Sequence, residues 1–106
     1  MADIKTPTRP FDVAAHIRTT EEAAAYLSAA LEENDPAAFR RALGDVARAR
    51  SMASVADASG LGRESLYKAL SQTGNPSLDT VQRVIAALGL TLAVVPARQV
   101  TVADRN

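Results

Sequence analysis

The sequence contains no cysteine and no tryptophan, and only 4 % of its 106 residues are aromatic. The absence of cysteine excludes disulfide bonds, thiol nucleophiles and cysteine-based metal sites, and it is typical of proteins from a reducing compartment. Hydrophobic residues nevertheless make up 47 % of the chain, so its core must consist mainly of Ala, Leu, Val and Ile. This composition predicts one folded domain rich in helix.

Long apolar runs are also absent. No stretch approaches the roughly 18 apolar residues of a membrane span, and the amino terminus does not resemble a signal peptide. We therefore expect a cytoplasmic protein without membrane contact. The single histidine, His16, lies in a proline-flanked segment, so neither a metal cluster nor a Ser–His–Asp arrangement is expected. We predict no catalysis, no cofactor and no metal ion.

The net charge of zero conceals an uneven distribution. Residues 1–35 carry three basic and seven acidic side chains, a net charge of −4, whereas residues 36–96 carry seven basic and four acidic side chains, a net charge of +3. Such asymmetry indicates two surfaces with different partners, although ordinary surface charge is the simpler interpretation.

Hydrophobic periodicity and capping residues predict five helices after an extended arm at residues 1–18. Helix starts are indicated by a Thr19–Glu22 capping box, Asp35 before Pro36, Ser51 and Ser77. The fourth helix is expected to run from Arg63 to about Ser71. Residues 90–95 (LTLAVV) alternate weakly and end at a proline, which predicts a short closing strand, with a flexible tail at 97–106. The domain itself would span residues 19–96.

The most informative segment is SMASVADASGLGRESLYKALS, residues 51–71. Two helices joined by so short a turn must cross steeply, which requires a small residue where they approach, a residue that tolerates positive φ in the turn, and apolar residues that seal the pair onto the domain. The six positions are filled accordingly by Val55, Ala56, Gly60, Leu61, Leu66 and Ala69. This is the helix-turn-helix pattern, in which the second helix enters the major groove of DNA.

Helix geometry then predicts which side chains face DNA. If Leu66, Ala69 and Leu70 face the core, the opposite face of that helix points outward, and the following loop lies beside it. Arginine and lysine recognise guanine or phosphate, and the polar side chains hydrogen-bond to bases or backbone. The predicted DNA-binding residues are Arg63, Glu64, Tyr67, Lys68, Ser71, Thr73 and Asn75.

The five-helix order, with the helix-turn-helix in the third and fourth helices, resembles the Cro/C1 (Xre) repressor class. Four segments are more narrowly similar to addiction-module antidote proteins, the antitoxins encoded beside a RelE/HigB/ParE-like toxin. They are RTTEEAAAYLSAALEENDP, ALGDVARARSM, GRESLYKALS and GNPSLDTVQRVIAALGL. Two positions depart from the repressor pattern: Met52 stands where the class often has a phosphate-contacting Gln, and Gly62 stands where the fourth helix usually has a Ser or Thr cap.

The resemblance implies a protein that neutralises a cognate toxin by direct binding and represses its own operon by binding operator DNA. The alternatives are a stand-alone Xre-type transcriptional regulator and a protein-interaction module that does not read DNA. We expect a homodimer in which the 90–95 strands pair across a two-fold axis; the alternative is that the strand folds back onto its own first or fifth helix. We also expect the acidic segment 4–35 to bind the toxin, with Ile4, Phe11, Val13 and Ile17 as apolar anchors, unless these residues pack on the domain itself.

Overall fold

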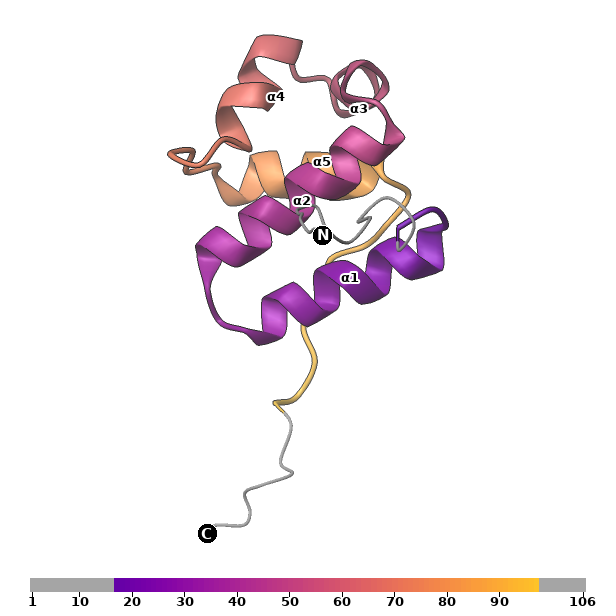
Figure 1. Cartoon of the computed structure of the whole chain (residues 1–106), viewed down its shortest axis with the longest axis vertical. Coiled ribbons are helices and arrows are strands. Elements are labelled where there is room, and N and C mark those ends of the chain that lie inside the picture. Colours follow the sequence, from indigo (N-terminus) through magenta and orange to yellow (C-terminus); the bar gives the residue numbers. More distant parts are fainter. Residues whose placement is uncertain (1–16, 98–106) are drawn as a thin grey trace, which may run out of the picture.

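The computed structural model describes residues 17–97, which form five α-helices and, within that range, no strand. The helices are α1 (Thr20–Glu32), α2 (Pro36–Arg50), α3 (Met52–Ser59), α4 (Arg63–Ala69) and α5 (Leu78–Ala87). The helices α1 and α2 lie side by side, α5 lies behind α2, and α3 and α4 sit at the end of the molecule remote from α1 (Figure 1). The predicted all-α class and the five helices are confirmed.

Local capping explains where the helices begin. The Thr19 hydroxyl accepts a hydrogen bond from the N–H of Glu22 at 3.0 Å, and the Glu22 carboxylate accepts one from the N–H of Thr19 at 3.1 Å. This reciprocal pair is the predicted capping box. The predicted caps Asp35, Ser51 and Ser77 likewise accept hydrogen bonds from the first turns of α2, α3 and α5.

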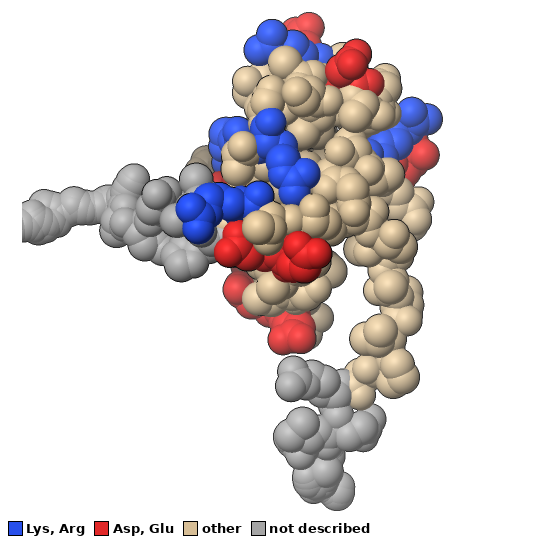
Figure 2. All heavy atoms as spheres, turned by 90° about the vertical axis from the view of Figure 1, so that its right-hand side faces the viewer, with Lys and Arg blue, Asp and Glu red and all other residues tan. Residues whose placement is uncertain are grey.

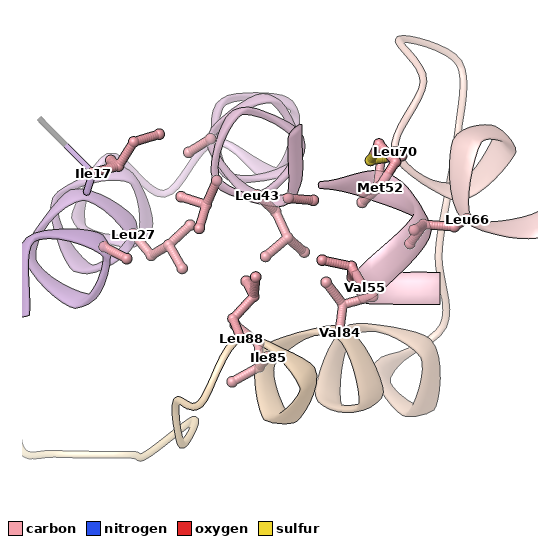
Figure 3. Close-up of a cluster of buried hydrophobic side chains, with 14 of the residues drawn as sticks. Ile17, Leu27, Leu43, Met52, Val55, Leu66, Leu70, Val84, Ile85 and Leu88 are labelled. Atoms are coloured by element: carbon pink, nitrogen blue, oxygen red, sulfur yellow. The ribbon is translucent and has the colours of Figure 1, made fainter. Parts of the chain in front are cut away.

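A single hydrophobic cluster joins all five helices. Leu43 of α2 lies at its centre, between Leu27 of α1, Leu88 at the end of α5 and Val55 of α3, and each of these side chains is at most 4 % exposed (Figure 3). Ile17, which the sequence placed in the arm, is also buried in this cluster. The simpler expectation for Ile17, packing on the domain, therefore describes it correctly; Ile4, Phe11 and Val13 lie outside the described residues.

The predicted strand at residues 90–95 is wrong. The chain there is extended but irregular, and it crosses behind α1 (Figure 1). A strand requires a ladder partner for its backbone N–H and C=O groups, and none is present among the described residues. Instead Leu90 and Leu92 pack against the core, and the N–H of Leu90 donates to the carbonyl of Ile85 at 3.1 Å. The segment thus folds back onto its own helices, which was the alternative expectation.

Candidate nucleic-acid interface

The turn between α3 and α4 is fixed by its own hydrogen bonds. Gly60 has the positive φ of 80° that the sequence required of it, and its N–H donates to the carbonyl of Ala56 at 3.1 Å. The buried hydroxyl of Ser59 donates to the same carbonyl and accepts from the N–H of Leu61, both at 3.2 Å. Sequence reasoning missed this role of Ser59, because serine at the end of a helix is usually exposed.

The two helices cross steeply and are sealed onto the domain by apolar side chains (Figure 1). Val55 and Ala56 of α3, Leu66 of α4 and Leu70 directly after it are buried, as the pattern required, while Leu61 is partly buried. Val55, Leu66 and Leu70 point into the common core (Figure 3). Since one side of α4 is fixed against the domain in this way, the other side faces solvent.

The solvent-facing side of α4 carries four of the seven predicted DNA-binding residues. Arg63, Glu64, Tyr67 and Lys68 are all exposed, with Tyr67 at 48 %. Within residues 17–97, the side chains of Arg63 and Lys68 have no hydrogen-bond or ion-pair partner. Their positive charges are therefore available to an anionic ligand without breaking an existing contact.

Several other arginines of the basic half are already engaged by the protein. Arg48 pairs with Asp45 at 3.0 Å and Arg83 with Asp79 at 2.9 Å. The guanidinium groups of Arg40 and Arg50 donate to backbone carbonyls after α4 and α5. Four of the seven basic side chains of residues 36–96 are thus already bound to groups of the protein, and Arg63 and Lys68 are not among them.

Ser71 differs from the rest of the predicted set. The fourth helix ends at Ala69, two residues before the expected end at about Ser71, so Ser71 lies in the turn after the helix. Its hydroxyl donates to the carbonyl of Lys68 at 2.9 Å, and its own carbonyl accepts from Arg40 at 2.9 Å. Ser71 is half-buried and holds the end of α4 in place.

The predicted loop residues lie next to Lys68. Thr73 and Asn75 share with Lys68 a shallow depression formed between α4 and the beginning of α5. Ser65, Ser77 and Thr80 line the same depression, and the sequence analysis did not select them. The spacing of Ser65 and Lys68, three residues apart on one helix, was the available signal for Ser65. All six are hydrogen-bonding side chains of the kind that contact phosphates.

The two departures from the repressor pattern have distinct structural consequences. Met52, the first residue of α3, is buried in the core, so its side chain does not reach toward a phosphate. Gly62 caps α4 with ordinary φ of −70° and makes no side-chain hydrogen bond. The first turn of α4 therefore keeps free N–H groups beside Arg63.

Other kinds of site receive no support in the part of the chain that the structure describes. Residues 17–97 contain no group of three or more His, Cys, Asp or Glu placed to hold a metal ion. No helix in that range is long and apolar enough to span a bilayer. His16 lies outside the described residues.

Comparison with known proteins identifies the family. The sequence model of the family described as "Probable addiction module antidote protein" matches residues 7–96. The chain belongs to this family. A relative from Haemophilus influenzae, described as "Uncharacterized protein", is 47 % identical over 90 residues, which cover 85 % of this chain and 93 % of the relative. No solved structure matches the chain. Membership of an antidote family indicates a regulatory, non-enzymatic antitoxin role and, in general terms, a toxin as partner.

Proposed function

We propose that this antidote protein neutralises a cognate RelE/HigB/ParE-like toxin by direct binding and represses its own operon through a Cro/C1-type (Xre) helix-turn-helix. The observation that carries the DNA-binding part is the solvent-facing side of α4. It presents Arg63 and Lys68, which have no hydrogen-bond or ion-pair partner within residues 17–97, on a helix whose opposite side is buried in the core. Arginine and lysine on such a helix reach the guanine edge and the phosphates of the major groove.

Operator recognition in this proposal is dimeric. One α4 spans two turns of helix at most and reads only a few base pairs, whereas two copies related by a two-fold axis read an inverted repeat with half-sites about 34 Å apart. Sedimentation of the protein with a duplex from its own promoter measures this directly. Two chains per duplex support the dimer, and one chain per duplex contradicts it.

A toxin-rescue experiment tests the antitoxin part. The reading frame adjacent to this gene is expressed from an inducible promoter, with and without this protein, and growth is measured. We expect the neighbouring product to arrest growth, the antidote protein to restore it, and the two proteins to co-purify. Growth arrest without rescue, together with failure to co-purify, would contradict the proposal.

The same experiment addresses the second candidate function, a stand-alone Xre-type transcriptional regulator without a toxin partner. The helix-turn-helix geometry suits that function equally well, because nothing in α3 and α4 depends on a toxin. Promoter binding combined with a harmless neighbouring product would favour it. Family membership supports the antitoxin.

A further inference from the structure

An apolar groove lies on the side of the domain remote from α4. It is formed by α1, by Phe39 of α2, by the end of α5 and by the extended segment that follows α5; its lining includes Leu27, Leu31, Phe39, Leu90, Leu92 and Val95. No residue of α3 or α4 contributes to it. Because α1 and α4 lie at opposite ends of the molecule (Figure 1), the groove stays open when α4 faces DNA.

Apolar side chains at the edge of this groove are exposed to solvent. Val94 and Val95 are 99 % and 74 % exposed, and Leu31 of α1 is 44 % exposed. The backbone N–H groups from Leu92 to Val95 find no acceptor among the described residues. Contiguous exposed apolar side chains beside open main-chain donors are typical of a surface that a partner covers.

The charge around the groove specifies the partner. No lysine or arginine lines it or occurs in α1, whereas Glu21 and Glu32 lie at either end of the α1 row that includes Ala24 and Leu31. Acidic side chains gather on the lower part of the molecule, at the height of α1 (Figure 2). A second copy docked here would bring another acidic α1 against the first, at an electrostatic cost.

We infer that this groove binds a basic amphipathic segment of the cognate toxin, whose apolar side chains enter between α1 and residues 90–95 while its lysines or arginines meet Glu21 and Glu32. This inference rests on the proposed antitoxin function and specifies its binding surface. Of the acidic segment 4–35 expected to bind the toxin, only one face of α1 belongs to this surface. Residues 90–95 form the other side of it. Since the groove and α4 are separate, toxin and operator bind at the same time.

The test measures the affinity of the full-length protein for the purified product of the adjacent reading frame. Leu31→Lys and Val95→Lys each place a like charge against a basic partner; both residues line the groove and are exposed, so the fold tolerates the substitutions. Leu78→Lys is the matched control, because Leu78 is 65 % exposed on α5 and does not line the groove. We expect Kd to rise about tenfold or more for the groove variants and less than about twofold for the control.

A second pair of variants isolates the charge. Glu21→Lys alters the acidic rim, whereas Glu33→Lys makes the same change on the other side of α1, where Glu33 lines a different depression. We expect only Glu21→Lys to weaken binding and to reduce its dependence on salt.

Each outcome has a distinct meaning. If the wild-type protein neither binds nor rescues cells from the adjacent product, the proposed function itself is wrong. If the wild type binds and both groove variants bind equally well, the toxin docks elsewhere and this inference alone is overturned. Dissociation of a wild-type dimer into monomers by Leu31→Lys would show the groove to be an interface between copies and would also overturn it. Promoter binding by Leu31→Lys should stay at the wild-type level.

Discussion

The guanidinium of Arg40 in α2 donates a hydrogen bond of 2.9 Å to the backbone carbonyl of Ser71, 31 residues later in the chain. The same guanidinium donates to the carbonyl of Gln72 at 2.7 Å. These two contacts tie α2 to the turn that follows α4. Arg40 is thus placed to position the candidate DNA-binding helix.

Replacing Arg40 tests this positioning role. Arg40→Ala leaves two carbonyls of the turn without their charged donor and should lower the free energy of unfolding by about 1–3 kcal/mol. Arg41→Ala removes the same charge from an exposed neighbour and should have little effect. Chemical denaturation of the two variants provides the comparison. Equal stability of both would show that the contact with Ser71 contributes nothing.

Gly74 is required by the close approach of its backbone to α4. A Cβ added at Gly74 would lie 2.5 Å from the carbonyl oxygen of Lys68 and closer still to that of Ala69, whereas a Cβ at Gly62 would meet nothing within 4 Å. Gly74→Ala should therefore cost about 2 kcal/mol of stability. Gly62→Ser adds a capping hydroxyl and should raise stability by a few tenths of a kcal/mol. Thermal unfolding measures both changes, and a harmless Gly74→Ala would contradict the argument.

Ser51 joins α2 and α3 with a φ of +114°, a conformation that side chains rarely adopt. Ser51→Gly relieves this strain and loses little as a cap, so we expect the free energy of unfolding to rise by about 1 kcal/mol. Ser51→Ala retains the strain and loses the hydrogen bond to the N–H of Ser54, so stability should fall by about 1 kcal/mol. Changes of the same sign in both variants would refute this account.

Tyr26 of α1 contributes a dependence on alkaline pH. Its hydroxyl donates to the carboxylate of Asp45 in α2 at 2.8 Å. Burial, then this hydrogen bond and the negative charge of Asp45, raise the pKa of Tyr26 from 10.0 to about 12, and only Arg41 opposes them. The folded state thus holds the proton more tightly than the unfolded state. The resulting stability is fully present below pH 10 and is lost as the pH rises from 10 to about 12.

Ultraviolet absorbance of tyrosinate measures this shift. The chain has two tyrosines and no tryptophan, so Tyr67→Phe leaves Tyr26 as the only source of the signal. We expect its midpoint near pH 12 in the folded protein and near 10 in denaturant. A folded-state midpoint at 10 would contradict the contact between α1 and α2.

Sequence predicted the local features of this fold well, because caps and turns depend on neighbouring residues. The Thr19–Glu22 capping box and the left-handed Gly60 both lie where the residues themselves require them. The apolar pattern after α5 predicts a strand wrongly: residues 90–95 have the composition of a strand, but a strand depends on a partner that no local pattern reveals.

The exposed residues of the candidate site could be predicted from the sequence, whereas the long-range hydrogen bonds that hold the surrounding turns could not. The positions of the buried residues and the helical spacing were enough to predict that Arg63, Tyr67 and Lys68 face solvent. The spacing could not show that Arg40 and Arg50 donate to carbonyls 31 and 38 residues away, since such contacts arise only from packing. It also could not show the exposure of Leu31, which has the period of a core residue.

Promoter affinity of an Arg63→Ala, Lys68→Ala double variant tests the central claim most directly. Each substitution removes an exposed cation that has no partner in the described part of the chain, so the circular dichroism spectrum should be unchanged. We expect the loss of Arg63 to weaken the free energy of DNA binding by about 1–3 kcal/mol and to reduce discrimination between bases. The loss of Lys68 should reduce the slope of log K against log salt concentration by about one. The control Arg18→Ala removes a positive charge before α1, remote from α4, and should bind DNA like the wild type. Wild-type promoter affinity in the folded double variant would contradict DNA reading by α4.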